Sequence, residues 1–170
     1  MAYRLRPITA DDQDGLQAIF ASTRTDELAL TGWPEAQCQA FVAMQFEAQW
    51  QHYTRHYPDA LCQLILQDGG AGSTCVAGRL WVDRRADTVH VLDIALLPEA
   101  RGQGLGGACL RDLIDEAGRR QMSLTISVEI HNPARRLYER LGFEAQGEAQ
   151  GLYQRMAWQP ATPRQLEHQE

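Results

Sequence analysis

The chain has 170 residues, of which 44% are hydrophobic and 22% are charged, and its formal net charge at pH 7 is −6. This length is typical of one domain with a single core. Nucleic-acid-binding proteins usually carry a basic excess, so the acidic balance argues against a nucleic-acid partner. The first residues lack the apolar segment of a signal peptide, and no apolar run approaches the ~20 residues that span a bilayer. We therefore expect a cytoplasmic protein with no membrane partner.

The cysteine pattern argues against a metal centre. Cys38, Cys62, Cys75 and Cys109 are far apart in the sequence and form no C-x-x-C pair. Structural zinc sites usually draw their ligands from closely spaced pairs. We expect four free thiols, packed as small apolar side chains in a reducing compartment, and no bound metal.

The first third of the chain predicts one short strand and two helices. Residues 3–6 alternate as in a strand, which ends at Pro7. Thr9 is a suitable cap for a helix with acidic residues in its first turn and apolar residues 16, 19 and 20 on one face. Residues 25–33 show no period and predict a connection. Pro34 then begins a long helix, which should end before Pro58.

The rest of the chain predicts short strands that alternate with helices. In chain order we expect a hairpin of strands 61–66 and 74–82 joined at glycines 69–72, a polar turn over 83–87, an apolar central strand over 89–97, a helix over 104–120, a strand over 124–130, a short helix over 133–141 ending at Gly142, and final strands over 143–145 and 152–158. No repeat or linker interrupts this order. We predict one domain over residues 1–158 and a flexible tail over 159–170.

A glycine-rich segment, Arg101–Gly107, lies between the apolar strand and the helix that follows it. Glycines let backbone N–H groups approach a phosphate, and the helix N-terminus adds a positive dipole end. Arg101 would add a charge-assisted contact. A plain tight turn is the alternative, although four glycines in six residues exceed what one turn needs.

The residues alone leave more than one phosphate ligand open. A nucleotide P-loop is excluded because Ala108 and Cys109 stand where Lys and Ser/Thr would follow. The spacing of Gly102, Gly104 and Gly107 does match G-x-G-x-x-G, and Glu129 lies roughly where the ribose-binding acid should be. Such loops normally open the first βαβ unit, however, and this one comes late in the chain. The late position therefore argues against a dinucleotide-dependent oxidoreductase.

Two motifs lie in the second half of the chain. Residues 101–106, Arg-Gly-Gln-Gly-Leu-Gly, fit the pattern Gln/Arg-x-x-Gly-x-Gly/Ala and follow a strand that ends at Pro98, and residues 132–143 fit the pattern Asn…Leu-Tyr-x-x-x-Gly-Phe. Together these two motifs resemble those of the GCN5-related N-acetyltransferase family. The resemblance covers the whole chain in order and separation. It implies an α/β (α+β) fold with a mostly antiparallel sheet of six to seven strands and about four flanking helices.

The resemblance also implies a donor site for acetyl-CoA as co-substrate. The central strand would offer its backbone to the pantetheine arm at Ile94, Ala95 and Leu96, with the N–H near Ile94 stabilising the oxyanion. Asn132 would contact the arm, and Tyr138 would act as general acid to the leaving thiolate. The pyrophosphate would be held by Arg101, Gly102, Gln103, Gly104, Leu105, Gly106 and Gly107.

The base and the acceptor site are less defined. His90, near the place of the glutamate base in histone-acetylating members, would share the face of Ile94 by strand alternation and could deprotonate the amine. An ordinary strand residue is an equal alternative. Asp93, a charge in an apolar run, should have a partner. We expect the acceptor, a small-molecule or protein amine, to contact Glu27, Trp33 and Tyr153.

The predicted function is N-acetyl transfer from acetyl-CoA to a primary amine, without a metal. The alternative on the same fold is a non-catalytic acyl-CoA-binding regulatory domain. Tyr138 favours the enzyme, since a binding module would not need a general acid. Whether the chain forms a homodimer is left open.

Overall fold

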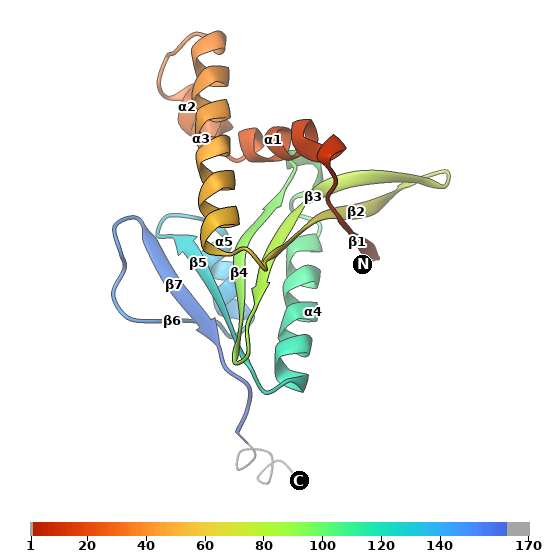
Figure 1. Cartoon of the computed structure of the whole chain (residues 1–170), viewed down its shortest axis with the longest axis vertical. Helices are drawn as coiled ribbons and strands as arrows, with labels where there is room; N and C mark the ends of the chain where they lie inside the picture. The colour runs from red at the N-terminus through yellow and green to blue at the C-terminus, as the bar shows by residue number, and fades with distance from the viewer. Residues whose placement is uncertain (1, 163–170) are drawn as a thin grey trace. The chain divides into compact units, whose positions relative to one another are not determined.

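The computed structural model describes residues 2–162. They fall into two compact units, the first built from residues 2–81 and 93–106 and the second from residues 82–92 and 107–162. Seven strands form one mixed sheet in the order β1-β2-β3-β4-β5-β7-β6 (Figure 1). Of the predicted tail, residues 159–162 form no helix or strand and 163–170 lie outside the described residues. That residues 1–158 act as one domain stays a prediction.

The first unit contains the N-terminal helices and one side of the sheet. Strands β1 and β2 pair antiparallel, with Leu5 opposite Ile65. In the described part of the chain no helix is both long and apolar enough to cross a membrane. The elements of this unit are β1 (Tyr3–Pro7), α1 (Gln13–Ser22), α2 (Thr25–Ala29), α3 (Glu35–His56), β2 (Leu61–Gly70), most of β3 (Ser73–Arg84) and the second part of β4 (Thr88–Leu96).

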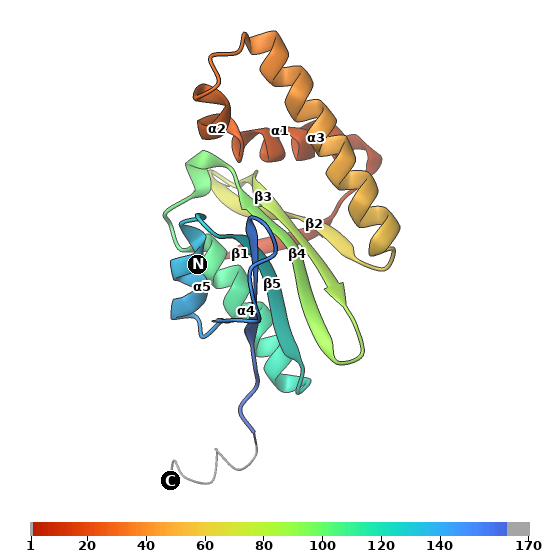
Figure 2. The same ribbon diagram turned by 90° about the vertical axis from the view of Figure 1, so that its left-hand side faces the viewer.

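Helix α1 begins at Gln13, later than its sequence predicts. A short 3₁₀ turn at Ala10–Asp12 precedes it, and Thr9 and Asp12 form a reciprocal capping box. The apolar face of α1 is buried, and Phe20 packs on Phe46 of α3 with ring centroids 5.9 Å apart. The predicted long helix is confirmed as α3, which runs from Glu35 to His56. Helices α1, α2 and α3 lie together in Figure 2.

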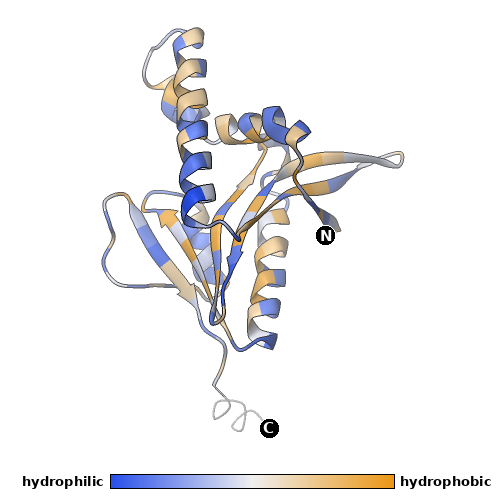
Figure 3. Cartoon of the chain, in the orientation of Figure 1, coloured by the Kyte–Doolittle hydropathy of each residue, from blue (hydrophilic) through white to orange (hydrophobic). Residues whose placement is uncertain are grey.

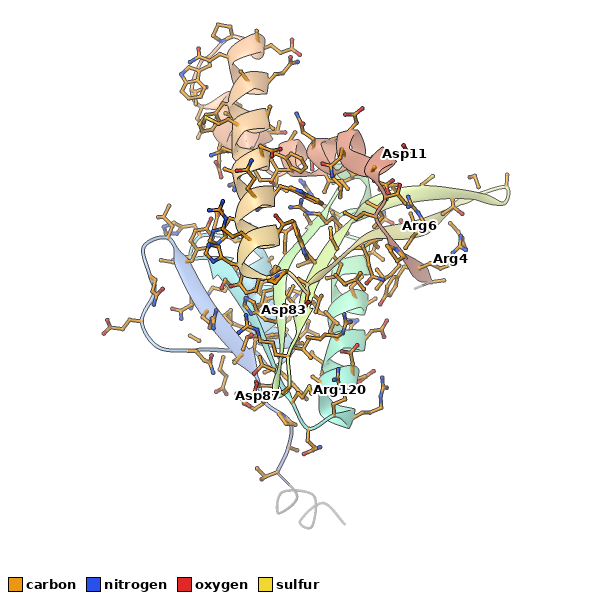
Figure 4. All side chains as sticks on the ribbon, viewed as in Figure 1. Arg4, Arg6, Asp11, Asp83, Asp87 and Arg120 are labelled. Carbon is orange, nitrogen blue, oxygen red and sulfur yellow. The ribbon has the colours of Figure 1, made fainter. Side chains whose placement is uncertain are left out.

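Two local predictions were wrong. The predicted connection over 25–33 contains α2, which was missed because five residues are too few to show an apolar period. The predicted polar turn over 83–87 is shorter, because Asp83 and Arg84 still belong to β3. Asp83 is buried and accepts a 2.7 Å hydrogen bond from Arg85, whereas Asp87 lies near the hairpin tip (Figure 4).

The second unit is built around β5 and α4. The parallel ladder of β4 with β5 runs from Thr88 opposite Ser123 to Val91 opposite Ile126, and β5 also pairs antiparallel with β7. Apolar and polar positions alternate along α4 (Figure 3), as its sequence predicts. The elements are α4 (Leu105–Arg119), β5 (Ser123–Glu129), α5 (Ala134–Arg140), β6 (Glu144–Ala145) and β7 (Tyr153–Trp158).

Candidate functional site

The glycine loop has a backbone that requires glycine. Gly102 and Gly104 have φ of +72° and +81°, a region that other residues rarely adopt. A Cβ added at either position would meet no atom within 4 Å, so open space lies beside both residues. The Gln103 side chain donates a 2.8 Å hydrogen bond to the Glu99 carbonyl and braces the loop from outside. The loop therefore leaves its backbone accessible to a ligand.

The start of α4 supplies donors beside that space. Because the helix begins at Leu105, the N–H groups of Leu105, Gly106 and Gly107 have no intrahelical acceptor. Their partial positive charge adds to that of the helix dipole. Backbone donors and a glycine path without side chains suit a diphosphate, so these residues fit the coenzyme predicted from the sequence.

The guanidinium of Arg101 forms its hydrogen bonds with residues of the first unit. Its Nε donates to the Leu96 carbonyl at 2.9 Å, and its Nη2 lies 3.2 Å from the Ser22 carbonyl and 3.3 Å from the Ser22 hydroxyl. The side chain thus joins the end of β4 to the end of α1. Nη1 makes no hydrogen bond within residues 2–162 and stays available to an anion.

The strand residues assigned to the pantetheine arm lie at the end of β4. Ala95 is buried, and Ile94 and Leu96 are half-buried. The parallel ladder with β5 ends at Val91 and does not include these three residues. On β3, Gly78 is so close that a Cβ there would overlap the Ala95 carbonyl oxygen. The position of this part of β4 therefore depends on glycine in the strand beside it.

In the second unit, Asn132 and Tyr138 lie at opposite ends of a tight motif. Asn132 Oδ1 accepts a 2.9 Å hydrogen bond from the Ala134 N–H and starts α5, while its Nδ2 makes none within the described residues. Tyr138 is 6% exposed and its ring lies 6.0 Å from that of Phe143. Gly142, with φ of +97°, ends α5 and returns the chain to β6.

His90 is buried in the second unit. Its Nδ1 lies 2.7 Å from the Thr125 hydroxyl, in the register that pairs the two residues across β4 and β5. Burial, followed by the nearby charge of Arg155, lowers the pKa of His90 to about 4. The imidazole is therefore neutral at pH 7, and the Thr125 hydroxyl fixes its orientation.

The predicted acceptor residues do not share one environment. Glu27 is exposed and forms an ion pair with Arg24 at 3.2 Å. Trp33 is 38% exposed and packs edge-on against Phe41. Tyr153, in the other unit, is 49% exposed at the start of β7. Trp33 lines a groove between helices and Glu27 does not.

Arg79 is a buried charge that sequence reasoning missed. It is 1% exposed, and its Nη2 lies 2.7 Å from Asp93 and 2.8 Å from Gln49 Oε1. The expected partner of Asp93 is therefore Arg79. Both residues interrupt apolar runs, but residue 79 lies six positions before Arg85 and residue 93 only five after Thr88, so regular hairpin pairing would place them on opposite faces. Arg79 Nη1 is buried and makes no hydrogen bond to any of residues 2–162.

A mixed sheet in which a central strand leads through a glycine loop into a helix matches the fold expected of the acyl-CoA-dependent N-acyltransferases. The model of the Acetyltransferase (GNAT) family matches residues 21–143, and the chain belongs to this family. The resemblance drawn from the two motifs is thus confirmed. The protein is therefore an acyl-CoA-dependent N-acetyltransferase of this family.

A relative is named as an N-acetyltransferase, and solved structures share the fold. The chain is 28% identical over 122 residues to a Bacillus subtilis (strain 168) protein provisionally named ribosomal protein bS18-alanine N-acetyltransferase, covering 70% of this chain and 77% of that one. The fold resembles PaiA N-acetyltransferase from Thermoplasma acidophilum in complex with coenzyme A, with a TM-score of 0.68, 14% identity and coverage of 94% and 99%. It also resembles the Escherichia coli ribosomal-protein-S18-alanine N-acetyltransferase, with a TM-score of 0.58, 21% identity and coverage of 95% and 96%.

Proposed function

We propose that the protein transfers the acetyl group of acetyl-CoA directly to a primary amine of a protein, at its N-terminus. The observation that carries the donor half is the open glycine path of Gly102 and Gly104 in front of the free N–H groups of α4. The acceptor half is supported by sequence similarity to the Bacillus subtilis protein, which is named for acetylation of a ribosomal-protein alanine.

In the proposed reaction the neutral amine attacks the thioester carbonyl, forming the C–N bond as the C–S bond breaks. The Ile94 N–H would stabilise the oxyanion, and Tyr138 would donate its hydroxyl proton to the departing thiolate. Tyr138 would recover a proton from the attacking nitrogen as the amide forms, so that one proton moves from nitrogen to sulfur overall. The amine must lose a proton before it attacks. His90 is a proposed acceptor for that proton, since its lowered pKa keeps it neutral at pH 7. A pKa of about 4 makes His90 a weak base. The rate would therefore depend mainly on the fraction of the amine that is already neutral.

Replacement of Gly104 by valine tests the donor site. A Cβ-branched side chain cannot adopt φ of +81° without strain and would project into the space beside the loop. We expect acetyl-CoA affinity, measured by calorimetry, to fall by about 100-fold or more, by loss of the backbone contacts. Gly72→Val is the matched control, because Gly72 has φ of +78° in the β2–β3 turn and also meets no atom within 4 Å. Equal affinity in the two variants would mean that the loop is only a turn.

Replacement of Tyr138 by phenylalanine tests the general acid. The ring and its contact with Phe143 are kept, so only the hydroxyl is lost. We expect kcat to fall by about 10²–10⁴-fold with little change in the KM for acetyl-CoA, in a thiol-release assay. Tyr57→Phe, at the end of α3, is the control. An unchanged kcat would remove Tyr138 from the acid role.

The acceptor is tested with a peptide panel. Peptides with a free N-terminal alanine, the same peptides with a blocked N-terminus, and free lysine side chains are compared for thiol release in the presence of acetyl-CoA. We expect release only with a free N-terminus. Release with lysine side chains alone would overturn the N-terminal assignment but leave the acetyltransferase assignment intact.

A further inference from the structure

A groove between the three N-terminal helices has no role in the reaction described above. Its volume is about 740 Å³, within the range of ligand-binding clefts. It lies between α1, α2 and the first half of α3, all in the first unit (Figure 2). We call it the three-helix groove. It is lined by Asp14, Gln17, Ala18, Ala21, Thr25, Leu28, Ala29, Gly32, Trp33, Glu35, Cys38, Gln39 and Val42.

The groove faces away from the core side of α1. Leu16, Ile19 and Phe20 are the buried residues of that helix. The α1 residues that line the groove are Asp14, Gln17, Ala18 and Ala21, which lie on the opposite side by the 100° rotation per residue. An external position suits a partner larger than a small metabolite.

The groove is lined by small apolar residues and by charged residues of negative sign only. Small residues such as Ala18, Ala21 and Ala29 leave a hollow apolar floor, and the charged side chains are carboxylates, Asp14 and Glu35. No Lys, Arg or His is among the lining residues. A surface of this kind accepts an apolar side chain on its floor and a cation at its rim.

The rim charges are not compensated by the protein itself. Asp14 makes no hydrogen bond or ion pair within residues 2–162. Glu35 accepts one hydrogen bond, at 3.2 Å, from the neutral Gln39 amide. Arg24, which follows α1, forms an ion pair with Glu27 and lies over the Phe20 ring instead. The Trp33 ring, 38% exposed, offers a further contact to a cation.

We propose that the three-helix groove binds a cationic, apolar segment of the protein acceptor, separate from the amine that is acetylated. This inference rests on the proposed protein acceptor. An apolar side chain of the segment would fill the floor, and one or two Lys or Arg side chains would pair with Asp14 and Glu35. Charge complementarity favours this occupant over an anionic membrane surface, which the two carboxylates would repel.

The test uses a labelled peptide of alternating lysine and leucine with an acetylated N-terminus, so that it cannot be a substrate. Binding to the full chain is measured by fluorescence anisotropy, and the site is located by ¹H–¹⁵N chemical-shift changes. Peptides of alternating glutamate and leucine, and of alternating lysine and serine, separate the charge from the apolar contribution. We expect the lysine–leucine peptide to bind at least about tenfold more tightly than either, with shifts confined to α1, α2 and the start of α3.

Two groove variants and two matched controls locate the effect. Asp14→Asn with Glu35→Gln removes the rim charges and should weaken binding about tenfold, as expected for two exposed ion pairs. Ala18→Trp should fill the floor and abolish saturable binding. Asp26→Asn, on an exposed carboxylate of α2 outside the lining, and Ala48→Trp, on an exposed position of α3, should leave binding unchanged.

Other results overturn the inference. Equal binding by groove and control variants, or shifts outside the three helices, would reject the groove as the site. A concentration-dependent dimer that Ala18→Trp abolishes would show that a second copy occupies it. Acetyl transfer to a short N-terminal peptide is measured in parallel: activity without lysine–leucine binding rejects only the groove, and binding without activity rejects only the proposed function.

Discussion

The buried ion pair of Arg79 and Asp93 allows a quantitative prediction. Arg79 is 1% exposed and the Asp93 side chain is 23% exposed, so the two charges are unequally shielded from water. Asp93→Asn would leave the fully buried guanidinium without a counter-charge, which costs about 3–5 kcal/mol of unfolding free energy. Arg79→Met fills similar volume and leaves a carboxylate that water partly reaches. We expect it to cost less, about 2–3 kcal/mol.

The double variant tests whether these costs arise from the unpaired charge. With both charges removed, we expect the unfolding free energy to fall by at least about 2 kcal/mol less than the sum of the losses in the two single variants. Urea unfolding followed by circular dichroism gives the free energies, and Asp93→Asn should lower the Tm by about 10 °C. Glu139→Gln is the control, because its exposed ion pair with Arg135 should contribute less than about 0.5 kcal/mol. If Asp93→Asn costs no more than this control, the argument from burial is wrong.

Three further predictions follow from single sites. Gly78→Ala should lose about 1–3 kcal/mol in urea unfolding because its Cβ would overlap the Ala95 carbonyl, whereas Gly118→Ala, which meets only the Trp158 ring at an ordinary 3.4 Å, should not. The pKa of His90 is about 4 in the folded state and about 6.5 in the unfolded state. The free energy of unfolding should therefore be constant above pH 6.5 and fall by about 3 kcal/mol between pH 6.5 and pH 4, and His90→Gln should lack this pH dependence. The hydrogen bond from Arg6, followed by that from the Thr9 N–H, lowers the pKa of Asp12 to about 2. The stabilisation of the folded protein by the Asp12 carboxylate should therefore be complete above about pH 4 and be lost toward pH 2. The Asp12→Asn variant should lack this stabilisation at all pH values.

Elements with a strong period were predictable, and short or irregular ones were not. The apolar face of α1 and the cap at Thr9 fixed that helix because local hydrogen bonding and burial agree there. Helix α2 has five residues and no buried one, so no periodic signal existed. Asp83 was assigned to a turn because of its charge, yet β3 continues through it and Arg85 pairs with its carboxylate. Tertiary contacts therefore place Asp83 in a strand despite the low strand propensity of aspartate.

The ion pair of Arg79 and Asp93 shows a second limit. The sequence indicates that Asp93 needs a partner but does not identify it. The Arg85 N–H donates to the Thr88 carbonyl, and counting away from this pair places residue 79 opposite residue 94, so Asp93 would point to the other face of the sheet. The Leu97 N–H donates to the Ala77 carbonyl, so the pairing shifts by one residue along the hairpin, and counting from the turn does not identify the partner. Gln49, the third member, was not predictable either, because no sequence rule gives the angle at which α3 crosses the sheet.

The glycine loop explains why motifs predict backbone better than side chains. Gly102 and Gly104 encode the path of the chain directly, since few other residues adopt their φ, and the free N–H groups of α4 follow from where the helix begins. Arg101 stands in the same motif, but its long side chain can reach many acceptors. Its bonds to Leu96 and Ser22 depend on where α1 ends, far away in sequence. A contribution from this side chain to the donor site would therefore come through Nη1, or by holding the end of β4 in place, while the phosphate contacts themselves need only the backbone.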